Sequence, residues 1–144
     1  MATSVTPVDV LGGERVLGKK VREAYGINSR LRAGLPYSAL EAVQQALSLS
    51  REETATALCI PLRTLARRKR ERKLSADESD RAYRLAHLLA HALRVFDESQ
   101  TVSSWMRTPS PALGMVTPLS LLDTAAGVEQ VDTILGRIEY GVYS

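Results

Sequence analysis

The chain has 144 residues, of which 44% are apolar and 5% aromatic, and its formal net charge is +3. This length suits one globular domain or two small ones with a shared core, and the few aromatic side chains favour a helical interior of Leu, Ala and Val over an all-β fold. No apolar run is long enough to span a membrane, no signal peptide is seen, and a single cysteine excludes an internal disulfide, so we expect a cytoplasmic protein.

The charge is distributed unevenly along the chain. Residues 1–96 contain 17 Lys and Arg against 10 Asp and Glu, whereas residues 97–144 contain 2 against 6. The basic first part suits phosphate groups, which would repel the acidic last part. We therefore expect two surfaces with different partners, the second of them a protein.

The first 49 residues predict an arm followed by short helices. Residues 1–13 have no periodicity and contain Gly12-Gly13, so we expect a flexible or loosely docked arm. Residues 14–24 are interpreted as a helix with an apolar inner face. Ser38 and Glu41 have the spacing of a capping box, which predicts a helix over residues 39–47.

Residues 50–73 predict a helix-turn-helix. Ser50 and Glu53 form a second capping box, a helix runs to about Leu58, and Pro61 suits the first position of the next helix. Two short helices joined by a tight turn, the second of them basic, are typical of the motif that places its second helix in the major groove of DNA.

The second helix supplies the candidate DNA-binding residues. We expect three of them to face base edges and four to meet phosphates: Arg63, Thr64 and Arg67, and then Arg68, Arg70, Arg72 and Lys73. The alternative is that this basic helix is only a solvated face. The turn in such motifs often carries Gly, but Cys59 stands here, so we expect a turn that is strained or differently shaped.

Ser75 and Glu78 form a third capping box ahead of the longest periodic segment, residues 76–97. Its apolar positions recur at three and four, so this helix should span the molecule and bury side chains from both halves. Leu88 points in a second apolar direction, and we interpret it as a candidate subunit contact.

The last third predicts three more helices. Residues 101–107 form a short one that contains Trp105, interpreted as a core residue more readily than an interface residue. Thr117-Pro118 precedes a second over residues 119–122, and Thr124 caps a final helix over residues 125–140. No strand-like alternation appears, so the predicted fold is all-α: an N-terminal helix-turn-helix bundle joined by a long helix to a small helical domain.

The sequence does not indicate an enzyme. His87 and His91 are four residues apart, but no glutamate follows the first and no third ligand is evident, so we interpret them as structural. There is no glycine-rich phosphate loop and no evident nucleophile with its base. We expect no catalytic residues, no metal and no cofactor.

The C-terminal third resembles the toxin-binding domain of the Xre/MbcA/ParS antitoxins. The resemblance rests on Trp105, Leu113-Gly114, Thr117-Pro118-Leu119, Leu121-Leu122-Asp123-Thr124, Gly127, Val131, Leu135 and residues 137–142. Residues 64–68, with Leu74-Ser75 and residues 78–81, are similar to the divergent helix-turn-helix of the same family. Two departures are Cys59, where Gly is usual, and Ser110, where Asn is common.

The resemblance implies an antitoxin of a bacterial type II system. Its partner would be a RES-domain toxin that consumes NAD, and the NAD chemistry would belong to that partner. The antitoxin would bind the toxin directly and repress their operon by binding operator DNA, as a homodimer within a larger complex. Residues 1–75 would then form the Xre-like DNA-binding domain, and residues 76–144 the connecting helix and the toxin-binding domain.

Two alternatives to this antitoxin remain open. One is a free-standing helix-turn-helix regulator whose C-terminal domain dimerises or senses a ligand. The other is an adaptor that has lost DNA binding, which the unusual Cys59 keeps open. Binding of a neighbouring toxin would separate the antitoxin from the regulator, and a gel shift with the upstream DNA would test the adaptor.

The candidate toxin-binding residues lie at the end of the chain: Arg137, Tyr140, Val142, Tyr143 and Ser144. Tyr140, Tyr143 and the carboxylate of Ser144 form an aromatic, anionic tail. A pocket built for a dinucleotide accepts a flat ring and a negative group, so we expect this tail to enter or cover the toxin's pocket. The alternative is that Tyr140 closes the C-terminal core and the tail is loose.

Overall fold

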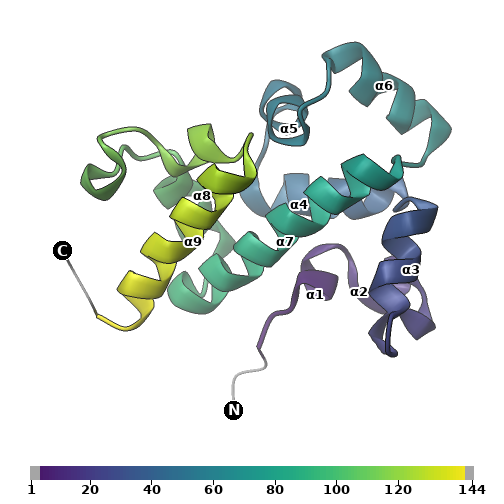
Figure 1. The fold of residues 1–144 in the computed structure, drawn as a ribbon, viewed down its shortest axis with the longest axis horizontal. Helices are drawn as coiled ribbons and strands as arrows, with labels where there is room; N and C mark the ends of the chain where they lie inside the picture. Colours follow the sequence, from purple (N-terminus) through teal and green to yellow (C-terminus); the bar gives the residue numbers. More distant parts are fainter. Residues whose placement is uncertain (1–3, 142–144) are drawn as a thin grey trace.

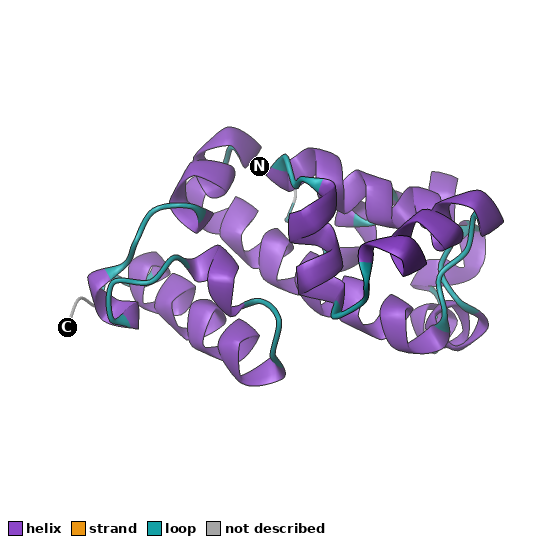
Figure 2. Cartoon of the chain, turned by 90° about the horizontal axis from the view of Figure 1, so that it is seen from above, coloured by secondary structure: helices purple, strands orange, loops and turns teal. Residues whose placement is uncertain are grey.

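The computed structural model describes residues 4–141, which fold into helices and loops (Figures 1 and 2). No strand forms among these residues, and the extended contacts are two isolated bridges, Pro36 with Lys73 and Ser110 with Val116. The α-helices of the described residues are α1 (Pro7–Val10), α2 (Gly13–Leu17), α3 (Gly26–Ala33), α4 (Tyr37–Leu47), α5 (Arg51–Leu58), α6 (Leu62–Glu71), α7 (Ala76–Phe96), α8 (Ser99–Met106) and α9 (Ala125–Glu139). Three 3-10 helices join them: η1 (Lys19–Arg22), η2 (Pro111–Leu113) and η3 (Pro118–Leu121).

Helix α7 is the central element of the fold. The Ser75 hydroxyl accepts from the Glu78 N–H, and the Glu78 carboxylate accepts from the Ser75 N–H, as the capping box predicts. Along its 21 residues α7 contacts α1, α3, α4 and α5 of the first half and α8 and α9 of the second (Figure 1). The predicted all-α architecture, with a long helix between two helical parts, is confirmed.

The N-terminal residues differ from the sequence prediction. Thr6 caps α1 in a capping box with Asp9, and α1 packs along α7 so that Val10 and Leu11 are buried. The expectation of a loosely docked arm is wrong for residues 4–13. Helix α1 buries apolar side chains, but its four residues are too few to show a repeating apolar pattern in the sequence. Residues 1–3 lie outside the described part of the chain.

Leu88 lies inside the chain rather than at a subunit contact. Its side chain is 2% exposed, and α1, α3 and α9 all pack against the helix that carries it. The second apolar direction of α7 is therefore explained by the docked N-terminal helices, and its interpretation as a subunit contact is wrong.

Two predicted helix starts are corrected by the tertiary structure. Helix α4 begins at Tyr37, with Pro36 as its N-cap, so Ser38 lies inside the helix and does not cap it. The start is set by the end of α6: the Tyr37 N–H donates to the Arg72 carbonyl at 3.1 Å, and the Leu74 N–H to that of Leu35 at 2.9 Å.

The predicted helix over residues 14–24 is divided. Helix α2 ends before Gly18, whose φ of 95° lies in the left-handed region, and the separate turn η1 follows. A side chain is disfavoured at such a φ, so Gly18 allows the chain to change direction there.

The C-terminal part packs α8 and α9 against α7, and η3 against α8 and α9. Thr124 caps α9 by accepting from the Gly127 N–H at 2.9 Å, as predicted. Trp105 is half-buried against the core, with its ring 5.5 Å from that of Phe96, which agrees with its interpretation as a core residue.

Candidate functional site

The turn between α5 and α6 has a common helix-ending geometry, although it lacks glycine. Cys59 is left-handed, with φ 58° and ψ 41°, and its N–H donates to the Thr56 carbonyl at 3.1 Å. Pro61 is the N-cap of α6, one residue before the helical position predicted for it. Of the two expected outcomes, the turn keeps a common shape and is strained at Cys59. A non-glycine residue at this φ costs on the order of 1 kcal/mol.

The Cys59 thiol also contacts the C-terminal part of the chain. Its Sγ donates to the Asp123 carbonyl at 3.0 Å, just before α9. From the second turn of α7, the Arg81 guanidinium donates to the Leu58 carbonyl at 3.2 Å. The turn is held from outside the motif, which offsets part of its local strain.

Helix α6 presents an arginine face to solvent. Leu65 is its one buried residue, and Arg63, Arg67 and Arg70 lie on the exposed side at spacings of four and three. No carboxylate of residues 4–141 pairs with these three guanidinium groups. The face is free to meet the phosphates and base edges of a groove.

The other predicted DNA-binding residues occupy less open positions. Thr64 is half-buried at the edge of α6, Arg72 is its left-handed C-cap, and Lys73 is exposed in the bridge to Pro36. These residues flank the arginine face.

Arg68 differs from the other arginines of α6. Its Nε donates to the Glu78 carboxylate at 2.7 Å and its Nη1 to the Glu71 carboxylate at 3.2 Å. Burial acts to raise the pKa of Glu78, but the Arg68 guanidinium and the Ser75 N–H outweigh it and lower that pKa. Arg68 thus joins α6 to the first turn of α7 and positions the helix, and we place it outside the proposed phosphate contacts.

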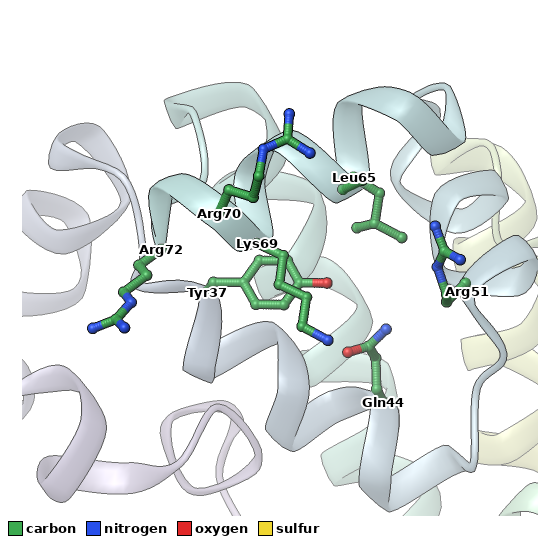
Figure 3. A pocket seen from close by; sticks show the side chains of 8 residues that line it. Tyr37, Gln44, Arg51, Leu65, Lys69, Arg70 and Arg72 are labelled. Carbon is green, nitrogen blue, oxygen red and sulfur yellow. The ribbon is translucent and has the colours of Figure 1, made fainter.

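A hollow of about 580 Å³ lies beneath α6, between it and α4 (Figure 3). It is lined by Tyr37, Gln44, Arg51, Leu65, Ala66, Lys69, Arg70 and Arg72. Arg51 and Lys69 were not among the residues predicted from sequence. They are 18 positions apart on different helices, and only the packing of α5 against α6 brings them to one place.

The C-terminal part carries several exposed apolar side chains. Tyr140 is 80% exposed, Met115 62% and Val116 42%. A groove of about 390 Å³ lies nearby, lined by Ala112, Leu113, Leu121, Gln130, Thr133, Ile134 and Arg137. The alternative in which Tyr140 closes the core is wrong. Val142, Tyr143 and Ser144 lie outside the described residues.

The histidines of α7 have unequal surroundings. The His91 ring nitrogens lie 2.7 Å from the Asp132 carboxylate and 3.1 Å from the Glu139 carboxylate, which joins α7 to α9. His87 is exposed beside the Tyr83 ring.

Within residues 4–141 no three His, Cys, Asp or Glu side chains are grouped to hold a metal ion. No helix of these residues has the length and apolar character to cross a membrane.

Comparisons with known proteins match both parts of the chain. The description "Antitoxin Xre-like helix-turn-helix domain" matches residues 26–87, and "Antitoxin Xre/MbcA/ParS C-terminal toxin-binding domain" matches residues 91–141. An Antitoxin Xre of Photorhabdus laumondii is 33% identical over 120 residues, which are 82% of this chain and 81% of that protein.

The chain belongs to the Xre antitoxin family. An Antitoxin Xre of Yersinia enterocolitica is 31% identical over 117 residues, 79% of this chain and 78% of that protein. A Prs ADP-ribosylating antitoxin of a Sphingobium species is 36% identical over 80 residues, 49% of this chain and 50% of that protein. Members of this family are antitoxins rather than enzymes. The Xre helix-turn-helix implies DNA binding, and the C-terminal domain implies a cognate toxin.

Proposed function

We propose that this Xre-family chain neutralises a RES-domain, NAD-consuming toxin by direct contact and represses the operon that encodes both proteins. The observation that carries the proposal is the match of both parts of the chain to one antitoxin family. The Sphingobium relative is named for ADP-ribosylation, a reaction whose ADP-ribose comes from NAD. We propose residues 1–75 for DNA and residues 76–144 for the toxin.

On the DNA side, the exposed face of α6 would enter the major groove. Arg63, Thr64 and Arg67 would contact base edges, with Arg70 and the residues after the helix on the phosphates. One helix supplies few contacts, so we propose a homodimer that reads two half-sites, within a larger complex with the toxin.

The DNA part is tested with Arg67→Ala. Removing an arginine from a phosphate lowers the log–log salt slope by roughly 0.9, and removing it from a base edge costs about 1–3 kcal/mol. We expect weaker binding to the upstream DNA in a gel shift. The control, Arg15→Ala, removes an exposed arginine from α2, a helix below α7 in Figure 1, and should bind as the unmodified protein does. If Arg67→Ala and the unmodified protein bind the DNA with the same affinity and the same salt dependence, α6 is not the recognition helix.

On the toxin side, we propose that Tyr140, Arg137 and the segment Val142–Ser144 cover the toxin's NAD pocket. The exposure of Tyr140 and the adjacent groove support an interface at this end of the chain. Deletion of residues 142–144 and, separately, Tyr140→Ala should restore NAD consumption by the co-expressed toxin. Glu129→Ala, on the exposed part of α9 before these residues, is the control.

Full inhibition by the truncated protein would show that the tail is not the blocking element. Co-purification with the product of the neighbouring gene tests the function itself. A chain that represses the operon yet forms no complex with that product would be the free-standing regulator.

A further inference from the structure

The hollow beneath α6 lies on the side that faces α4, because the contacts that hold α6 in place are made with other parts of the chain. At its start the turn of residues 59–61 joins it to α5, and at its end residues 72–74 pair with residues 35–37. The Arg68–Glu78 ion pair fixes its opposite edge to α7. A space of about 580 Å³ therefore lies between α6 and α4, and Figure 3 shows the side chains that line it.

The lining of this hollow is cationic without compensation. Four of its eight lining residues are basic and none is acidic: Arg51, Lys69, Arg70 and Arg72 carry the charge. None of these four forms an ion pair with a carboxylate of residues 4–141. Some exposed arginines elsewhere on the surface do find such partners, as Arg22 does with Asp9 and Arg84 with Asp80, whereas Arg63 and Arg67 of α6 are unpaired within the described residues, as the residues of the hollow are.

Polar groups converge inside the hollow. In Figure 3 the Lys69 amine, the Tyr37 hydroxyl and the Gln44 amide point into one space that Arg51 borders, while Arg70 and Arg72 point outward at the rim. The Gln44 amide is fixed by donating to the Thr54 hydroxyl at 3.0 Å. The Tyr37 hydroxyl has no hydrogen-bond partner among the described residues.

The surroundings of Tyr37 suit it to donate a hydrogen bond. Burial and the nearby Glu41 raise the pKa of Tyr37, and the Arg51 charge lowers it less than these two raise it. The phenol is therefore protonated at neutral pH. A protonated hydroxyl, an ammonium and a guanidinium are donors around one space, in which the Gln44 amide oxygen is a neutral acceptor and no carboxylate of the described residues belongs to the lining. Phosphate oxygens are the charged acceptors that these donors match.

We propose that this hollow is a phosphate-binding site, in which Arg51, Lys69 and Tyr37 hold the phosphate group. Leu65 and Ala66 form an apolar wall beside it, and the volume lies in the range of sites for small organic ligands. Two sources can supply the phosphate: the backbone of DNA bound to α6, or a free phosphate ester. The first source rests on the proposed operator binding, whereas the second does not.

The experiment uses the full chain and two arms. In the first, thermal unfolding is followed with inorganic phosphate, pyrophosphate and AMP at constant ionic strength, for the unmodified protein and for the double variant Arg51→Gln/Lys69→Gln. In the second, the salt dependence of binding to the upstream DNA is measured for the same two proteins. The control double variant, Arg15→Gln/Lys19→Gln, removes the same charge from exposed positions outside the hollow.

A free ester as the source predicts that Tm rises by several degrees with pyrophosphate or AMP, and that the double variant abolishes this rise while the control keeps it. DNA as the source predicts no such rise. Instead, the slope of log affinity against log salt concentration should be smaller for the double variant, by roughly 0.9 for each phosphate contact that the two substitutions remove. Either result supports the site and identifies its ligand.

The proposal is overturned if the double variant behaves as its control does in both arms. Tyr37→Phe is a second variant that keeps the ring and removes the hydroxyl, so it should weaken the same response without unfolding the domain. If Arg67→Ala loses DNA binding while Arg51→Gln/Lys69→Gln behaves as its control does, the phosphate site is rejected and the proposed function stays in place.

Discussion

The Arg107 guanidinium lies 2.9 Å from the Glu53 carboxylate, and this contact joins the C-terminal part of the chain to the helix-turn-helix. Glu53 is also the capping-box residue of α5, so one carboxylate serves the helix start and the contact between the two parts. Arg107 further donates to the last carbonyls of α4, those of Leu47 at 3.0 Å and Ser48 at 2.9 Å. A single side chain of the toxin-binding domain thus holds the ends of two helices of the DNA-binding part.

Arg107→Ala should lower the free energy of unfolding by about 2 kcal/mol, because several charge-assisted hydrogen bonds disappear. The Ser48 carbonyl loses its donor, while the Leu47 carbonyl keeps the Ser103 hydroxyl at 2.9 Å. Urea denaturation measures this change. The matched control is Arg84→Ala, which removes an exposed i,i+4 pair with Asp80 worth about 0.3–0.5 kcal/mol. Equal losses of stability in the two variants would contradict a structural role for Arg107.

Glu78→Gln should destabilise the protein by roughly 3 kcal/mol. Glu78 is 4% exposed and accepts from both Arg68 and the Ser75 N–H, so its neutralisation leaves the half-buried guanidinium with only the exposed Glu71 as a charged partner among the described residues. Glu71→Gln is the control, since Glu71 contacts the same arginine at 3.2 Å but is exposed. Its effect should stay within about 0.5 kcal/mol. A Glu78 variant as stable as the Glu71 variant would show that the pair does not hold α6.

Stability should fall as the pH is lowered from about 5 toward 3. The Ser50 N–H and Arg107 lower the pKa of Glu53, and Arg68 lowers that of Glu78 against the effect of burial. Carboxylates with folded pKa values below their unfolded ones stabilise the protein above the unfolded pKa, and this contribution is lost as the pH falls through the folded one.

Urea denaturation as a function of pH measures this loss. The Glu78→Gln variant should show a shallower pH dependence over the same range, because one of the carboxylates with a lowered pKa no longer titrates. An unchanged dependence in that variant would exclude Glu78 as a contributor.

Gly127→Ala should destabilise the C-terminal domain by about 2 kcal/mol or more. An added Cβ would lie 1.8 Å from the Leu121 carbonyl oxygen, so α9 would have to move away from η3. Gly136→Ala on the same helix meets nothing within 4 Å and should stabilise it by about 0.5–1 kcal/mol. Thermal unfolding of both variants measures the difference, and a stabilised Gly127 variant would show that η3 does not pack closely there.

Local signals in the sequence predicted many of the helices correctly. The capping boxes at Ser50 and Ser75 and the cap at Thr124 marked helix starts that the structure confirms. Such signals succeed where the start of a helix is decided by residues within one turn of it. Ser38 had the same spacing and failed, because the bridge from residues 72–74 fixed the start of α4 from outside.

The same distinction between local and long-range features holds for the candidate site. The order of motifs and the basic face of α6 could be predicted from the sequence, because charge and helical spacing depend on residues close together in the chain. The sequence did not predict that Arg68 pairs with Glu78. Nor did it predict that Arg51 and Lys69 line one hollow. These depend on how helices separated by loops are placed against one another.

By itself, the sequence determined the helical class, the family and the separation of a basic from an acidic part, because composition, caps and motif residues are local. The tertiary structure decided which arginines face outward, that the N-terminal helices dock on α7, and that Tyr140 is exposed. The physical reason is that exposure and ion pairing are set by contacts between distant segments, whose free energy outweighs the local preferences of either segment.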